Sequence, residues 1–215
     1  MFALTTSPRD LHSPFTSELH GRRGLLNLED VLTLYSIALF LHISGALGVF
    51  AALALDWVGI SNLRRAGTAE QVGEWAGVYR IIRGLGAASV VALLVFGLYM
   101  TAVTWGPTGW IGIGFLSLLF IAVLGAVSGI RLGRILAVAA RGQGPIADGV
   151  RAQLRAPLFV ASVRARTAVA VGVVFLMTVK PEAAISLLVI GVALALGIAS
   201  AIPVLREESL RPQSI

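Results

Sequence analysis

The feature that most constrains this chain is an uncharged run from Val31 to Leu55, with Asp30 and Asp56 on either side. The run holds about 25 residues, and a helix needs about 20 apolar residues to cross the hydrocarbon core of a bilayer. Further apolar stretches follow along the chain. The sequence therefore predicts an all-α fold, a polytopic transmembrane helical bundle with about five spans.

The predicted domain organisation is one transmembrane helical domain, residues 27–206, between two tails. We expect a polar or surface-lying tail over 1–26 and a C-terminal tail over 207–215. Asn27 is the expected N-cap of the first helix. The spans are expected at about 31–55, 84–105, 110–130, 158–179 and 183–205.

Two local signals refine the predicted helices. Thr68 is followed three residues later by Gln71, a capping-box pattern that predicts the start of a new helix. The fourth span is long enough to cross a membrane only if it includes Arg164 and Arg166. Arginines near a helix end can extend their aliphatic stems to the membrane surface, so we expect both side chains at the interface.

Composition and charge support a membrane location. The chain is 57% hydrophobic and 13% charged, whereas soluble domains are about 25% charged. Its 17 basic residues are spread between the apolar segments rather than clustered, which argues against a nucleic-acid partner. Most of them follow the first span, the third span or the fifth. The positive-inside bias then predicts an N-terminus outside and a C-terminus in the cytoplasm.

Several chemistries are excluded by residue type. The chain has no cysteine, so it has no disulfide, thiolate metal site, iron–sulfur cluster or cysteine nucleophile. It also contains no Walker A loop, no HExxH motif and no dinucleotide-binding glycine pattern. No catalytic residue is therefore assigned, and an enzymatic role is not the favoured interpretation.

His42 is the strongest candidate for chemistry. An ionisable side chain inside a span is costly and is by default a functional hypothesis. A neutral imidazole there could ligate the iron of haem b or relay a proton, or it could hydrogen-bond to a neighbouring helix. The other histidines, His12 and His20, precede the first span. Two-histidine haem ligation within one chain is therefore not expected, and no metal site is predicted beyond a haem iron at His42.

Four arginines lie at the predicted cytoplasmic helix ends. Arg80 and Arg83 are spaced to share one helix face, and Arg131 and Arg134 repeat that spacing on the third span. Together they could bind an anion such as a lipid headgroup, a haem propionate or an anionic substrate. The simpler interpretation, which we favour, is general contact with anionic lipid.

Small residues form two patterns that favour close helix packing. The third span carries Gly125, Gly129 and Gly133 at four-residue spacing, and the first carries Ser44 and Gly48. Such small-xxx-small series let membrane helices approach closely. They indicate helix packing or dimerisation rather than chemistry.

Residues 31–141 also resemble a known group of proteins. The carrying motifs are LHISGALGVF (Leu41 to Phe50), with its leading histidine, and GLYMTA (Gly97 to Ala102) before a Trp-flanked turn. They resemble uncharacterised bacterial integral membrane proteins distantly related to copper-resistance protein D and HemJ-type protoporphyrinogen oxidases. The resemblance implies a multi-pass protein of the bacterial cytoplasmic membrane, with His42 at a haem-ligand position. This chain departs from that group because it lacks a second intramembrane histidine and a lysine partner within the second span.

The sequence thus favours an integral membrane protein that is an accessory or structural subunit or a self-associating bundle. Its expected partners are the lipid bilayer and either another membrane protein or further copies of itself. One alternative is a haem-binding or redox protein that uses His42. A second alternative is a small-solute transporter or channel.

Overall fold

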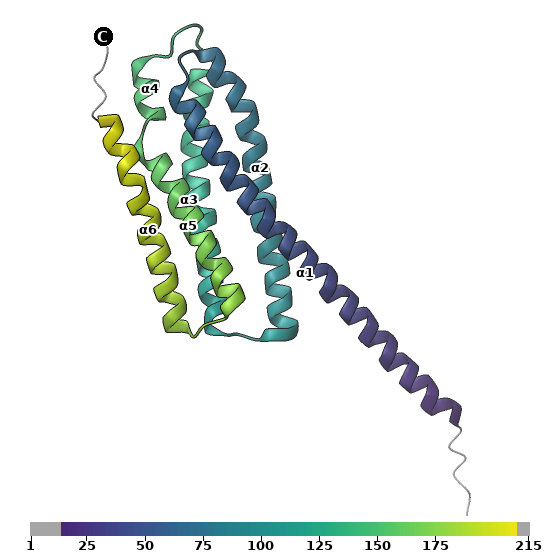
Figure 1. Cartoon of the computed structure of the whole chain (residues 1–215). Coiled ribbons are helices and arrows are strands. Elements are labelled where there is room, and N and C mark those ends of the chain that lie inside the picture. The colour runs from purple at the N-terminus through teal and green to yellow at the C-terminus, as the bar shows by residue number, and fades with distance from the viewer. Residues whose placement is uncertain (1–13, 210–215) are drawn as a thin grey trace, which may run out of the picture.

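The computed structural model describes the backbone of residues 14–209 and the side chains of residues 30–203. The predictions for residues 1–13 and 210–215 lie outside this part of the chain. The elements, shown in Figure 1, are α1 (Pro14–Arg65), α2 (Ala69–Met100), the π-helical segment η1 (Thr101–Trp105), α3 (Gly109–Ala139), α4 (Asp148–Leu154), α5 (Pro157–Val179) and α6 (Ala183–Ser209).

Five of these segments are long and apolar enough to cross a membrane, and no named strand occurs in the described residues. The predicted all-α, five-span fold is therefore confirmed, and the chain is a multi-pass integral membrane protein. The membrane-capable segments are Asp30–Arg65, Ala69–Trp105, Gly109–Ala139, Asp148–Val179 and Ala183–Pro203.

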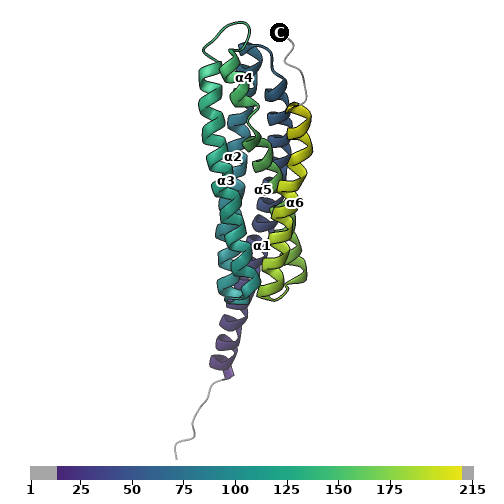
Figure 2. The same cartoon turned by 90° about the vertical axis from the view of Figure 1, so that its left-hand side faces the viewer.

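The helices form an upright bundle that α1 crosses obliquely (Figures 1 and 2). At one end, here called the α4 end, lie the α1–α2 connection and α4. The opposite end, here called the tryptophan end, holds Trp105 and Trp110, whose rings meet edge to face at 6.0 Å between centroids. Lys180 places its Nζ 4.0 Å from the centroid of the Trp105 ring. The N-terminal part of α1 leaves the bundle beyond this end (Figure 1).

Burial differs between the two halves of the bundle. The larger core cluster lies toward the α4 end and includes Leu63, Val72, Leu132 and Phe159. A smaller cluster around Val49 lies nearer the middle. Toward the tryptophan end, many large apolar side chains face outward. Outward-facing apolar side chains are expected of membrane-spanning helices, because lipid tails solvate them as well as a protein core would.

Helix boundaries confirm one prediction and correct another. Thr68 is the N-cap of α2, and its hydroxyl accepts a hydrogen bond from the Gln71 amide at 3.4 Å, so the predicted helix start is confirmed. The N-cap prediction at Asn27 is wrong, because α1 already begins at Pro14. The polar residues before the first span extend the same helix instead of starting a new one.

Candidate functional site

The most concentrated polar chemistry in the described residues is a buried ion pair between α1 and α5. Arg166 Nη2 lies 3.0 Å from Asp56 Oδ2, and the two side chains are only 9% and 10% exposed. Arg166 Nε also donates to the Ser162 carbonyl at 3.3 Å. Arg166 therefore does not reach the interface as predicted, because a carboxylate from α1 neutralises it inside the bundle.

Serine hydroxyls extend this polar site to α3. The Oγ atoms of Ser128 and Ser162 lie 2.7 Å apart, and both residues are buried. Ser128 Oγ also lies 2.6 Å from the Leu124 carbonyl, to which it donates. One connected set of hydrogen bonds thus links α1, α5 and α3.

The glycine series on α3 holds two arginine side chains. A Cβ atom added at Gly125 would lie 3.0 Å from Arg166 Nη1. One added at Gly129 would lie 3.0 Å from Arg83 Nε, and one at Gly133 would lie 3.4 Å from Arg83 Nη1. Because these three side chains are missing, a strip of bare backbone runs along α3, and we call this strip the glycine ridge. Within this chain it accommodates guanidinium groups from α2 and α5.

The ridge brings a second positive charge from α2 close to the ion pair. Arg83 Nη1 donates to the Gly129 carbonyl at 3.3 Å. Its charge interacts electrostatically with Asp56, and the buried Tyr79, one turn earlier on α2, lies within range of the same charges. Four helices thus meet at a site with two guanidinium groups and one carboxylate, which we call the charged junction.

The other three arginines of the predicted anion site are placed differently. Arg80, Arg131 and Arg134 are all exposed. In the described residues, no hydrogen bond or ion pair connects them to Arg83 or to one another. Only Arg83 of this group is part of the charged junction.

His42 lies apart from the charged junction, in the α1–α2 contact. A Cβ added at Gly97 would lie 3.1 Å from His42 Cε1 and 3.3 Å from Nδ1. The Nδ1 atom is buried and makes no hydrogen bond within residues 30–203. About 21 Å of helix rise separates His42 from Asp56. The described residues contain no His, Cys, Asp and Glu cluster that could hold a metal ion, and haem ligation by His42 stays a prediction.

The small residues of α1 fall on two different faces. Gly48 faces the Ser89 hydroxyl of α2, and Gly45 faces the Ser89 carbonyl, so a Cβ at either position would crowd α2. Ser44 is exposed on the outside of the helix. Gly48 therefore lies inside the bundle, whereas Ser44 is available to a neighbour outside it.

Sequence reasoning missed the ion pair at the centre of the charged junction. Asp56 was interpreted as the boundary of an apolar run, and Arg166 as a residue reaching the interface. A signal was present, because Asp56 directly follows the uncharged first span and Arg166 lies within the fourth, and the two charges are opposite in sign. Pairing them would have predicted an α1–α5 contact.

Comparison of the chain with protein-family models, with curated proteins and with solved structures gave no significant match. The proposals below therefore rest on the geometry of the chain itself.

Proposed function

We propose that this protein is a non-enzymatic membrane subunit that self-associates through an exposed face of α1. The supporting observation is a row of residues spaced alternately three and four apart, all of them exposed. We call this row the α1 seam, and it consists of Thr33, Ile37, Phe40, Ser44, Leu47, Ala51, Ala54 and Val58.

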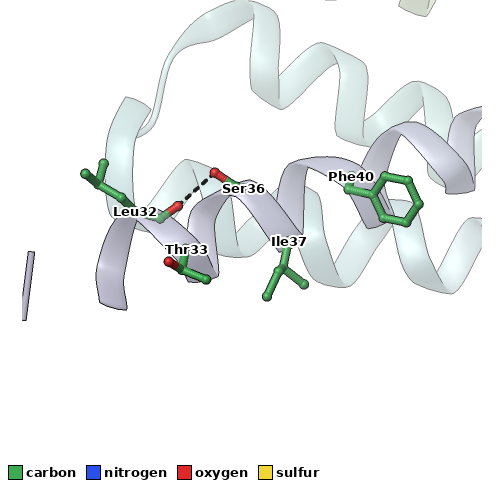
Figure 3. A pocket seen from close by; sticks show the side chains of 5 residues that line it. All are labelled: Leu32, Thr33, Ser36, Ile37 and Phe40. Atoms are coloured by element: carbon green, nitrogen blue, oxygen red, sulfur yellow. Dashed lines mark hydrogen bonds between the residues drawn. The ribbon is translucent and has the colours of Figure 1, made fainter. Parts of the chain in front are cut away.

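The composition of the α1 seam suits a helix–helix contact. In the middle of the seam, from Phe40 to Ala51, large and small residues alternate, and Phe40 and Leu47 are each 67% exposed. Figure 3 shows the start of the row, where Thr33, Ile37 and Phe40 line a shallow groove. When two helices interlock, large side chains of one fit into the spaces beside small residues of the other, and the contact repeats about every 3.5 residues.

The α1 seam lies on the opposite side of α1 from its contacts within the chain. Residues such as Ala38, Val49 and Leu53 are buried against the bundle, and they are offset from the seam by about half a helical turn. The α1–α2 contact therefore leaves the seam uncovered. An added helix could pack there without displacing any part of the bundle.

A second copy is the occupant that this seam fits best. The row carries no charge, so two seams can pair in hydrocarbon without desolvating an ion. Its alternation of large and small residues is complementary to itself, and the commonest symmetric contact uses the same patch on both subunits. An accessory role in a larger complex would use the same surface with a different partner.

The distribution of basic residues supports an orientation for this assembly. Arg64, Arg65, Arg134 and Arg141 all lie toward the α4 end of the bundle. By the positive-inside bias we infer that the α4 end faces the cytoplasm. The predicted location in a bacterial cytoplasmic membrane is part of this proposal.

The test is the stoichiometry of fluorescently labelled full-length protein in liposomes, measured by single-molecule photobleaching. Wild type is expected to show mostly two-step bleaching at densities where a monomeric membrane protein shows one step. The variant Ser44→Leu/Ala51→Leu fills the small positions of the α1 seam. Overpacking costs about 1–3 kcal/mol, which weakens association by roughly 5-fold to 150-fold.

The matched control is Ala195→Leu/Ala199→Leu, which adds the same bulk at exposed alanines of α6. This control is expected to remain dimeric. One-step bleaching of wild type would refute self-association and leave a different membrane protein as the partner. Equal loss of dimer in both variants would show that the α1 seam has no special role.

A further inference from the structure

Arg83 has far more hydrogen-bonding capacity than its surroundings use. It is exposed at the bundle surface, and its one hydrogen bond among the described residues goes to the Gly129 carbonyl. A guanidinium group carries five N–H donors and cannot lose its charge. The remaining donors can bind an acceptor that lies outside the bundle.

The glycine ridge gives the Arg83 guanidinium a fixed place against α3. We call this place the niche. Because Gly129 and Gly133 lack side chains, the guanidinium lies directly along the α3 backbone. The contact fixes the group on one face, while the exposed part of Arg83 stays accessible from outside the bundle. A flexible arginine at a helix surface would have no such fixed position.

The charge balance of the junction favours an anion. Asp56 is already bound by Arg166 at 3.0 Å, and within the described residues Arg83 forms no ion pair with any carboxylate. Two guanidinium groups against one carboxylate leave one positive charge without a counterion. An anion beside Arg83 would neutralise the junction.

The depth of Arg83 matches the headgroup layer. With a rise of 1.5 Å per residue, Arg83 lies about 33 Å along α2 and η1 from Trp105, and Gly129 lies about 28 Å along α3 from Trp110. Tryptophans mark membrane interfaces, and the hydrocarbon core is about 30 Å thick. The niche is therefore one core thickness from the tryptophan end, at the level of the phosphates of the other leaflet.

We propose that Arg83 and the glycine ridge bind the phosphate of one anionic lipid from the leaflet at the α4 end. A lipid is favoured over free phosphate because the niche lies at the headgroup level and Ala87 and Ala126, one helical turn from it toward the tryptophan end, are exposed. These apolar side chains would contact the acyl chains below a bound headgroup. The proposal is independent of the α1 seam, which lies on a different helix.

The experiment is native mass spectrometry of the full-length protein, titrated with phosphatidylglycerol in detergent. Wild type is expected to retain one phosphatidylglycerol in preference to phosphatidylcholine. In Arg83→Gln the affinity for phosphatidylglycerol should fall about tenfold or more, because a charge-assisted pair is lost. Gly129→Ala keeps the charge but fills the niche, so a weaker loss is expected. It also tests the proposal if the Arg83 variant does not fold.

Matched controls are Arg80→Gln on α2 and Arg131→Gln on α3, both at exposed positions, and neither should change the affinity appreciably. A second arm adds inorganic phosphate as a competitor, which is expected not to displace the lipid. Equal losses in the control variants would overturn the proposal in favour of general attraction to a basic surface. Displacement by inorganic phosphate would show a free-anion site and would also overturn it.

Discussion

Replacing Asp56 by leucine is expected to destabilise the bundle by about 3–5 kcal/mol, because it leaves the Arg166 guanidinium buried without its carboxylate. At 9% exposure this side chain cannot recover its hydration without local opening. Arg83 adds repulsion, since the same carboxylate also balances part of its charge. The thermal unfolding midpoint of the purified protein in detergent measures the loss.

The double variant Asp56→Leu/Arg166→Met separates a buried ion pair from simple packing. With both buried charges removed, no buried ion is left without its partner, because Arg83 is exposed, and stability should return close to that of wild type or above it. The exposed pair between Arg151 and Asp148 on α4, at 3.7 Å, is the control. Asp148→Ala should leave the midpoint almost unchanged. Equal destabilisation by the single and double variants at the junction would contradict the ion-pair account.

Gly197→Ala is expected to lower the free energy of unfolding by about 1–3 kcal/mol through overpacking. The new Cβ would lie 2.9 Å from the Arg164 carbonyl and from Ala165 Cα, both backbone atoms of α5. Backbone cannot rotate away as a flexible side chain can, so α6 must move off α5. That movement would also pull the Ser200 carbonyl away from Arg164 Nη1, which donates to it.

The control for this substitution is Gly191→Ala in the same helix. A Cβ at Gly191 would meet nothing within 4 Å, so the change should be neutral or slightly stabilising through helix propensity. Comparing unfolding midpoints of the two alanine variants isolates the α5–α6 contact. A midpoint for Gly197→Ala no lower than that for Gly191→Ala would show that α6 does not pack on α5 as closely as described.

The five-span fold was predictable because hydrophobic length alone specifies membrane-spanning helices. Val31–Leu55 and the other apolar runs exceed what a soluble helix would carry, whatever their neighbours are. The start of α2 was also predictable, since Thr68 and Gln71 act within one helical turn. These signals are local, so a single sequence contains them in full.

The charged junction was not predictable in the same way, because it depends on which helices pack side by side. Asp56 and Arg166 are 110 residues apart in sequence, and nothing local links them. The series Gly125, Gly129, Gly133 indicated close approach, but whether a helix backbone or an arginine side chain approaches is decided by the neighbouring helices.

The most direct test of self-association through the α1 seam is disulfide crosslinking of single-cysteine variants in native membranes. Because the chain has no cysteine of its own, each variant carries a single thiol. Oxidation should yield covalent dimers at Phe40, Ser44 and Leu47, with a yield that repeats about every 3.5 residues along α1. It should yield few at Leu196 of α6, which is 64% exposed. Equal crosslinking at Leu196 and Leu47, or none at either position, would contradict the account.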